Sequence, residues 1–214
     1  MAEPNTSLAL PLWLSLGAMA VNGMFGAAVA RTRLTPVYGT LLAGVLVGLG
    51  GGMVRDVLLG LEPIAISDWI YIPTVLVTAV VGGFVAFHLV RPQIGYLLVQ
   101  GFALGLLITI GTQKALEYRA PPISAIFLGV LTASAGGMIT DTITIHRASV
   151  MGQVHWLASS LVLGTVAFWA VDTYVNFYLG VLAAVLIVTT IRVLSVRHQW
   201  PSPRFPGEPS LKTS

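Results

Sequence analysis

Two acidic residues, each following a short run of glycine or other small residues, are the feature of this sequence best suited to chemistry. Residues 50–56 read GGGMVRD and residues 135–141 read AGGMITD, so Asp56 and Asp141 hold equivalent places 85 residues apart. Both lie inside long apolar segments, where a carboxylate costs about 2.5–3.5 kcal/mol even on a lenient insertion scale. Acids in such segments usually face a water-filled cavity or pair with a base. The doubled motif therefore predicts a permeation or transport site.

The small residues of the motif predict a weak point in each helix. Gly50, Gly51 and Gly52 cover every face of a helix and cost about 1 kcal/mol each relative to alanine. Packing against one neighbouring helix needs small residues on one face only. We therefore expect a break or kink at these three residues and another at Gly136 and Gly137, with carbonyls turned towards water or an ion. Helix packing remains the alternative, chiefly for the small residues that precede the motif at four-residue spacing.

Two basic residues accompany the acids. Arg55 precedes Asp56, whereas Thr140 precedes Asp141, so the two halves are electrically unequal. Neighbours on a helix point about 100° apart, so Arg55 and Asp56 need not pair with each other. A structural ion pair of Arg55 with Asp141, or of Asp56 with Lys114, is one interpretation; the other is that at least one of these charges lines the solute path. Lys114 either extends to the lipid headgroups or takes part in gating.

The composition indicates an integral membrane protein. Of 214 residues, 56% are hydrophobic and only 9% are charged, and the mean hydropathy is +0.87. Cysteine is absent, and the four histidines have no ligand-like spacing, so we expect no disulfide and no metal site. The net charge of +3 is spread through short loops, which argues against a nucleic-acid partner. No motif indicates catalysis or a cofactor, so the protein is not expected to be an enzyme.

Seven stretches are long and apolar enough to cross the bilayer. They lie near residues 8–30, 37–60, 70–90, 94–116, 123–146, 153–171 and 174–195. Turn-like clusters separate them, among them the segment from Glu62 to Asp68 and, before the last span, Asp172. After Arg192 the chain becomes polar and proline-rich, which is typical of a disordered tail.

The first half of the chain is repeated in the second. Residues 26–56 and 111–141 share ten identical positions of 31, including prolines, glycines and the acids. The offset contains three spans, so equivalent helices run antiparallel. We therefore predict an all-α integral membrane protein with seven transmembrane helices, as two inverted three-helix repeats plus a seventh helix. The first repeat occupies residues 1–92, the second 93–172, the seventh helix 173–196 and a disordered cytoplasmic tail 197–214.

The distribution of basic residues predicts the orientation. Arg31, Arg33, Arg91, Arg147 and Arg192 gather on one side with the basic residues of the tail. The acids of the loops gather on the other. By the positive-inside rule the N-terminus lies outside and the C-terminus is cytoplasmic.

On these residues the chain resembles the prokaryotic members of the trimeric intracellular cation (TRIC) channel family, the same broad family as bacterial glycine transporters. The resemblance covers roughly residues 10–195 and includes the segment GTQKA that ends in Ala115. It implies a homotrimer in the plasma membrane of a bacterium or archaeon, with one pore in each protomer, selective for monovalent cations, chiefly potassium. The implied kinks are at Gly50, Gly51, Gly52, Gly136 and Gly137, and the implied pore and gating charges are Arg55, Asp56, Asp141 and Lys114. Thr140 departs from the family's arginine, and Ala135 from its third glycine.

Two classes of function remain. A channel needs a continuous wet path with weak sites, whereas a secondary transporter of small amino acids such as glycine needs a closed site for a carboxylate and an ammonium group. Arg55 and Asp56 are candidates for binding such a zwitterion. The resemblance favours the channel.

Overall fold

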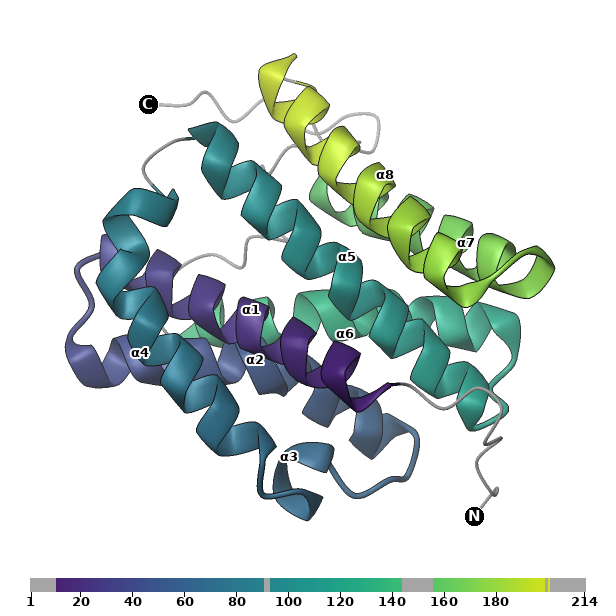
Figure 1. Cartoon of the computed structure of the whole chain (residues 1–214), viewed down its shortest axis with the longest axis horizontal. Helices are drawn as coiled ribbons and strands as arrows, with labels where there is room; N and C mark the ends of the chain where they lie inside the picture. The colour runs from purple at the N-terminus through teal and green to yellow at the C-terminus, as the bar shows by residue number, and fades with distance from the viewer. Residues whose placement is uncertain (1–10, 91–92, 144–155, 199, 201–214) are drawn as a thin grey trace, which may run out of the picture.

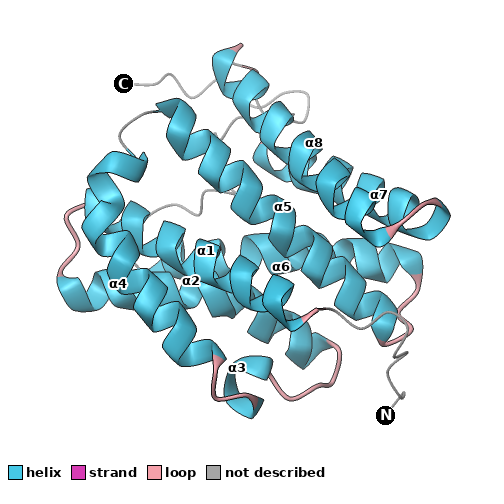
Figure 2. Ribbon diagram, viewed as in Figure 1, coloured by secondary structure: helices cyan, strands magenta, loops and turns pink. Residues whose placement is uncertain are grey.

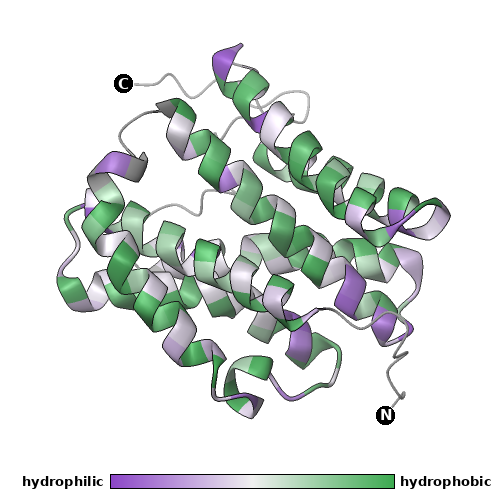
Figure 3. Cartoon of the chain, viewed as in Figure 1, coloured by the Kyte–Doolittle hydropathy of each residue, from purple (hydrophilic) through white to green (hydrophobic). Residues whose placement is uncertain are grey.

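The structure is a computed structural model that describes residues 11–90, 93–143, 156–198 and 200. Within these ranges every regular element is a helix, as Figure 2 shows. The helices are α1 (Leu12–Thr32), α2 (Val37–Leu58), α3 (Ile64–Ser67), α4 (Tyr71–Val90), α5 (Gln93–Glu117), α6 (Pro122–Ile143), α7 (Leu157–Tyr174) and α8 (Phe177–Arg197). Six of them, α1, α2, α5, α6, α7 and α8, are long and apolar enough to cross a membrane, whereas the apolar stretch Tyr71–Ala86 of α4 is shorter. Hydrophobic residues predominate along these helices (Figure 3), which confirms an all-helical, multi-pass membrane protein.

The helix bounds correct the sequence prediction in three places. The four-residue helix α3 lies in the segment expected to be a turn. Asp172 does not separate the last two helices, because α7 continues to Tyr174. The break falls at Asn176, whose side-chain oxygen accepts the N–H of Tyr178 at 2.8 Å and so starts α8. The predicted tail begins one residue too early, since α8 includes Arg197. Residues 8–10, 144–146, 153–155, 199 and 201–214 lie outside the described residues.

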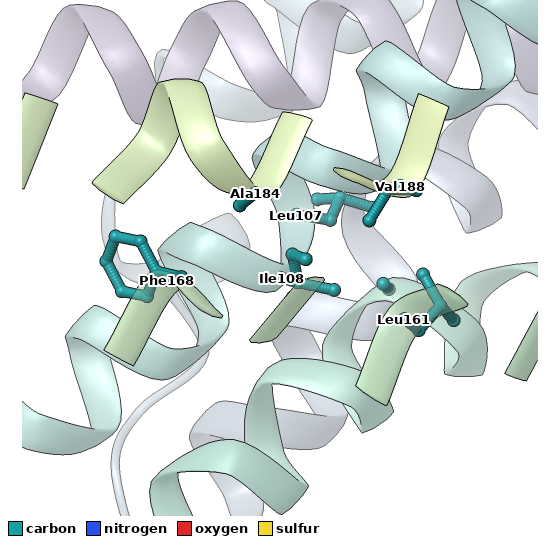
Figure 4. Packing of buried hydrophobic residues seen from close by; sticks show 7 residues of the cluster. Leu107, Ile108, Leu161, Phe168, Ala184 and Val188 are labelled. Carbon is teal, nitrogen blue, oxygen red and sulfur yellow. The ribbon is translucent and has the colours of Figure 1, made fainter. Parts of the chain in front are cut away.

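The helices form two groups, visible in Figure 1 as the purple-to-blue and the teal-to-yellow parts. In the first group α1, α2 and α4 pack against one another, around a core that includes Met19, Leu49 and Val75. In the second, α5 packs against α6, α7 and α8, around the core in Figure 4, which includes Ile108 and Phe168. Contacts of α2 with α6, and of α1 with α5, join the two groups.

The turns that follow α1 and α5 have the same conformation. Leu34 and Arg119, 85 residues apart, both have positive φ, of 61° and 59°. In each turn this residue donates to the carbonyl three residues back, and the next residue donates to the carbonyl five residues back. Pro36 and Pro121 then immediately precede α2 and α6. A left-handed conformation costs a residue other than glycine roughly 1–2 kcal/mol, so its occurrence at both equivalent positions marks one turn design used twice.

The glycine motifs lie where α2 crosses α6. A Cβ atom on Gly51 would lie 1.9 Å from the carbonyl oxygen of Thr132, and a Cβ atom on Gly136 would lie 2.9 Å from the carbonyl oxygen of Val47. Val47 and Thr132 are themselves equivalent under the 85-residue offset. Both α2 and α6 continue as α-helix through their glycines, so neither helix is broken there, while a kink within the continuous helix stays a prediction. These glycines let two helix backbones touch, because only hydrogen occupies the side-chain position.

Candidate functional site

Asp56, in the last turn of α2, is the centre of a buried charged cluster. Its Oδ1 atom accepts hydrogen bonds from Nε and Nη2 of Arg55, at 2.9 and 2.7 Å, and lies 3.3 Å from Nζ of Lys114 on α5. Its Oδ2 atom accepts the backbone N–H of Ile64 at 3.1 Å. The side chains of Asp56 and Arg55 are 0% and 1% exposed, so these bonds stand in place of water for the carboxylate, while Nη1 of Arg55 is buried without a hydrogen-bond partner among the described residues. Two positive groups surround this carboxylate, and the carboxylate of Glu117 on α5 also interacts with both of them.

This cluster settles two of the pairings left open by the sequence. The ion pair of Asp56 with Lys114 is present. Arg55 and Asp56, which as helix neighbours need not pair, do pair with each other. The arginine side chain is long enough to bend round the helix, and in a buried site the adjacent carboxylate compensates its charge best.

Asp141, near the end of α6, has a different environment. Its Oδ1 atom accepts a hydrogen bond from Nη1 of Arg33 at 3.2 Å, and Arg33 follows the end of α1. The side chain of Arg33 is 35% exposed, whereas that of Asp141 is 9% exposed. The hydroxyl of Thr140, which takes the place of the motif arginine, donates to the carbonyl of Gly136 at 2.9 Å. Asp141 is therefore nearly buried, and the base that binds it is partly exposed to solvent.

The two acids lie at opposite ends of the helix assembly. Asp56 is at the C-terminal end of α2, beside the C-terminal end of α5 that carries Lys114. Asp141 is at the C-terminal end of α6, beside the C-terminal end of α1, which Arg33 follows. Since α6 starts where α5 ends, and α2 starts where α1 ends, the two pairings fall on opposite sides. In both pairings, the acid of one group of helices contacts a base at the end of the first helix of the other group.

A cavity of about 100 Å³ lies between the two groups of helices on the Asp141 side. Its polar lining residues are Asn22, Arg33, Thr35, Tyr96, Gln100, Ser134, Thr140 and Asp141, and the rest of its wall is apolar or glycine. The exposure of the lining residues varies from 1% for Asn22 to 35% for the side chain of Arg33. The walls of this space come mainly from α1, α5 and α6, with Val47 of α2 and Leu157 and Leu161 of α7.

Of the predicted site residues, Gly137 and Asp141 line this cavity. A Cβ atom on Gly137 would meet nothing within 4 Å, so this glycine faces the open space. The described lining does not include the other predicted positions, Gly50, Gly51, Gly52, Gly136, Arg55, Asp56 and Lys114. Gly50, Gly51 and Gly136 pack between helices, and a Cβ atom on Gly52 would lie 3.5 Å from the side chain of Met19 and 3.7 Å from that of Arg55. The last three residues form the buried cluster.

The sequence analysis did not identify three polar residues in or behind the cavity wall, which are Asn22, Gln100 and Arg192. Asn22 donates to the carbonyls of Ala18 and Ala103, at 2.8 and 3.1 Å, and so links α1 to α5. Arg192 of α8 is 2% exposed and donates through Nη2 to Oε1 of Gln100. We counted Arg192 among the charges at the cytoplasmic end of a span, but it is buried between helices. An amide or a guanidinium inside an apolar segment is itself a signal of an interior polar surface, and it would have identified all three.

Comparison with known proteins identifies the family. The family model described as "Glycine transporter" matches residues 12–91 and 97–173. The UPF0126 inner membrane protein YadS of Escherichia coli is 28% identical over 203 residues, which cover 92% of this chain and 96% of the relative. A UPF0126 membrane protein of Deinococcus radiodurans is 28% identical over 190 residues, with 88% of each chain covered.

Solved structures agree with these relatives in fold. The TRIC trimeric intracellular cation channel orthologue from Rhodobacter sphaeroides superposes with a TM-score of 0.78 at 26% identity, covering 88% of this chain and 97% of the orthologue. A second TRIC cation channel superposes with a TM-score of 0.77 at 21% identity, covering 92% and 98%. The chain therefore belongs to the glycine transporter family and has the fold of the TRIC channels.

Proposed function

We propose that the protein is a homotrimeric channel for monovalent cations, chiefly potassium, with one path in each protomer. Each path runs through the cavity on the Asp141 side and continues towards the Asp56 cluster. The likeness to a TRIC channel orthologue at 26% identity over nearly its whole length supports this assignment. The chain then crosses the plasma membrane seven times, with α4 as the third span and the C-terminus in the cytoplasm.

The path lies between two inverted repeats, residues 1–92 and 93–172, with α8 outside them. Equivalent contacts support this arrangement. A Cβ atom on Gly26 would meet Val47, and one on Gly111 would meet the equivalent Thr132, at 2.6 Å in both cases. The two turns with positive φ, and the glycine contacts where α2 crosses α6, are also formed by residues that lie 85 positions apart in the sequence. Inverted repeats place the solute site at the interface between them, which is where the cavity lies.

The observation that carries the proposal is the placement of Asp141. Its carboxylate lines the cavity and pairs with Arg33, a base that is 35% exposed. An ion that displaces Arg33 finds a carboxylate, the hydroxyls of Thr140 and Ser134, and apolar walls that strengthen the attraction. Oxygen ligands of this kind suit a potassium ion, and the exchange with Arg33 keeps the site weak enough for release.

At the opposite end, the Asp56 cluster closes the path. Arg55 and Lys114 present positive charge to an approaching cation, and the hydrogen bond from Ile64 ties the segment after α2 to the same carboxylate. Conduction requires these bonds to rearrange. Gly52, where a Cβ atom would lie 3.7 Å from Nη2 of Arg55, and Gly137, where a Cβ atom would meet nothing within 4 Å, are the positions where α2 and α6 bend to allow it.

A transporter of glycine or a similar small amino acid is the second candidate. The description of the family model favours it, and so does the pairing of Arg33 with Asp141, which offers one group for a carboxylate and one for an ammonium. These residues replace Arg55 and Asp56 in that role, because the latter two are sealed from the cavity.

One experiment separates the two candidates. Purified protein in liposomes is tested side by side for potassium flux, with a potassium-loaded lumen, and for uptake of labelled glycine. The channel predicts potassium flux that is passive and unaffected by glycine. Concentrative glycine uptake without potassium conductance would establish the transporter instead.

A further inference from the structure

Arg192 stands apart from the charges already assigned to the path. It belongs to α8, which lies outside the two repeats, yet it is only 2% exposed and reaches the wall of the cavity. Its Nη2 atom donates to Oε1 of Gln100, and Gln100 lines the cavity while Arg192 lies behind it. A guanidinium stays charged at any physiological pH, so a fixed positive charge is built into this wall.

The bond from Arg192 also determines which face of Gln100 the cavity meets. Because the carbonyl oxygen of the amide turns to the guanidinium, the amide nitrogen is left to donate to other groups. Tyr96, whose side chain interacts with that of Gln100, also lines the cavity. The amide therefore offers the cavity donors, which suit an anion, and withholds the oxygen that would bind a cation.

The same wall is electrically linked to the mouth of the cavity. Arg192, Arg33 and Asp141 all lie within electrostatic range of Tyr96. Among the described lining residues the carboxylate is that of Asp141, which pairs with Arg33, so Arg192 adds a positive charge behind this wall. The charge of Arg192 and its hydrogen bond to Gln100 both weaken the binding of a cation in the cavity.

We infer that Arg192 is a specificity-determining positioning residue, which acts through Gln100 to limit how strongly the cavity prefers cations over anions. The inference deepens the proposed function and rests on it to the extent that the cavity is the solute path. It assigns α8 a role in selectivity that neither repeat can supply.

The test measures the electric field of the cavity directly. The chain has no cysteine, so a single Gly137→Cys substitution gives one thiol in the cavity, at a position with room for it. Full-length protein in liposomes is then labelled with two methanethiosulfonate reagents, one carrying a sulfonate and the other a trimethylammonium group. The ratio of the two labelling rates reports the sign and strength of the field, whether or not the protein conducts.

Arg192→Gln in this background should lower the anionic-to-cationic rate ratio by about three- to tenfold, because one unit charge near the thiol is removed. Arg192→Lys keeps the charge and a donor, so it should restore the ratio. Arg197→Gln is the matched control, since Arg197 is exposed on the same helix, and should leave the ratio unchanged. Gln100→Glu keeps the bond to Arg192 while neutralising its charge, and should lower the ratio as Arg192→Gln does.

An unchanged ratio in Arg192→Gln would overturn the inference. If Arg192→Gln fails to fold, Arg192→Met, which fills the same buried space without the charge, decides in its place, because Gln100→Glu also changes the ratio through its own charge in the cavity wall. Potassium flux measured in the same liposomes should rise in Arg192→Gln and in Gln100→Glu. If the parent carries no potassium at all, the proposed channel fails, while the labelling ratios still decide the role of Arg192.

Discussion

The contact between α2 and α6 can be tested by adding a single methyl group. In Gly51→Ala the new Cβ atom would start 1.9 Å from the carbonyl oxygen of Thr132, so the helices must separate by about 1.5 Å at this point to restore an ordinary contact. The obstructing atom is backbone and cannot rotate away. Overpacking of this kind costs about 1–3 kcal/mol, and we expect the upper end here. The better helix propensity of alanine offsets about 1 kcal/mol, which leaves a net loss of about 2 kcal/mol.

The matched control is Gly137→Ala in the equivalent motif. A Cβ atom there meets nothing within 4 Å, so the same substitution should be neutral or stabilising by up to about 1 kcal/mol. Thermal unfolding in mild detergent, followed by tryptophan fluorescence, measures both. For a chain of this size the apparent Tm of Gly51→Ala should fall by about 4–8 °C and that of Gly137→Ala should not fall. Equal Tm values for Gly51→Ala and the parent would refute the close helix crossing.

Three further predictions concern the charges, the orientation and the assembly. Asp56→Asn leaves Arg55 and Lys114 buried beside a neutral group, so it should cost about 3–5 kcal/mol of stability. Asp141→Asn should cost at most about 1 kcal/mol, because its partner Arg33 is 35% exposed. The Tm values of the two variants measure these losses, and similar losses would contradict the assigned environments. Glu62→Cys should react with an impermeant thiol reagent added to intact cells, and Leu34→Cys should not. Both positions are exposed, but in the proposed topology they lie on opposite sides of the membrane. The reverse labelling pattern would invert the proposed orientation. Chemical cross-linking in mild detergent should give bands up to three protomers, and a homogeneous monomer by light scattering would contradict the trimer.

Much of the fold could be predicted from the sequence because hydrophobic length and the repeated motif are strong local signals. The spans predicted near 37–60, 70–90 and 94–116 agree with α2, α4 and α5 to within two residues at each end. The failures came from tertiary packing. Three adjacent glycines suggest a broken helix when α2 is considered alone, but the backbone of α6 lies against them and the helix continues.

The candidate site could be predicted only in part, for a similar reason. Asp141 was found because an acid in an apolar segment is conspicuous. That Asp56 is sealed in a cluster while Asp141 faces a cavity depends on where Lys114 and Arg33 lie in space, and spacing along the chain does not determine this. Arg192 was misplaced because the positive-inside rule treats an arginine near the end of a span as a loop charge, whereas this one turns inward to Gln100.

The central claim, that ions pass through the cavity beside Asp141, is tested most directly by filling that cavity. Gly137→Cys places a thiol inside it, and Gly17→Cys places one at an exposed glycine of α1 where a Cβ atom also meets nothing within 4 Å. Each variant is reconstituted, modified with a membrane-permeant maleimide and checked by mass spectrometry for complete reaction, and potassium flux is measured before and after. Because the attached group occupies a space of about 100 Å³, flux through Gly137→Cys should fall at least about tenfold. Flux through Gly17→Cys should not change. Undiminished flux through fully modified Gly137→Cys protein would contradict the account.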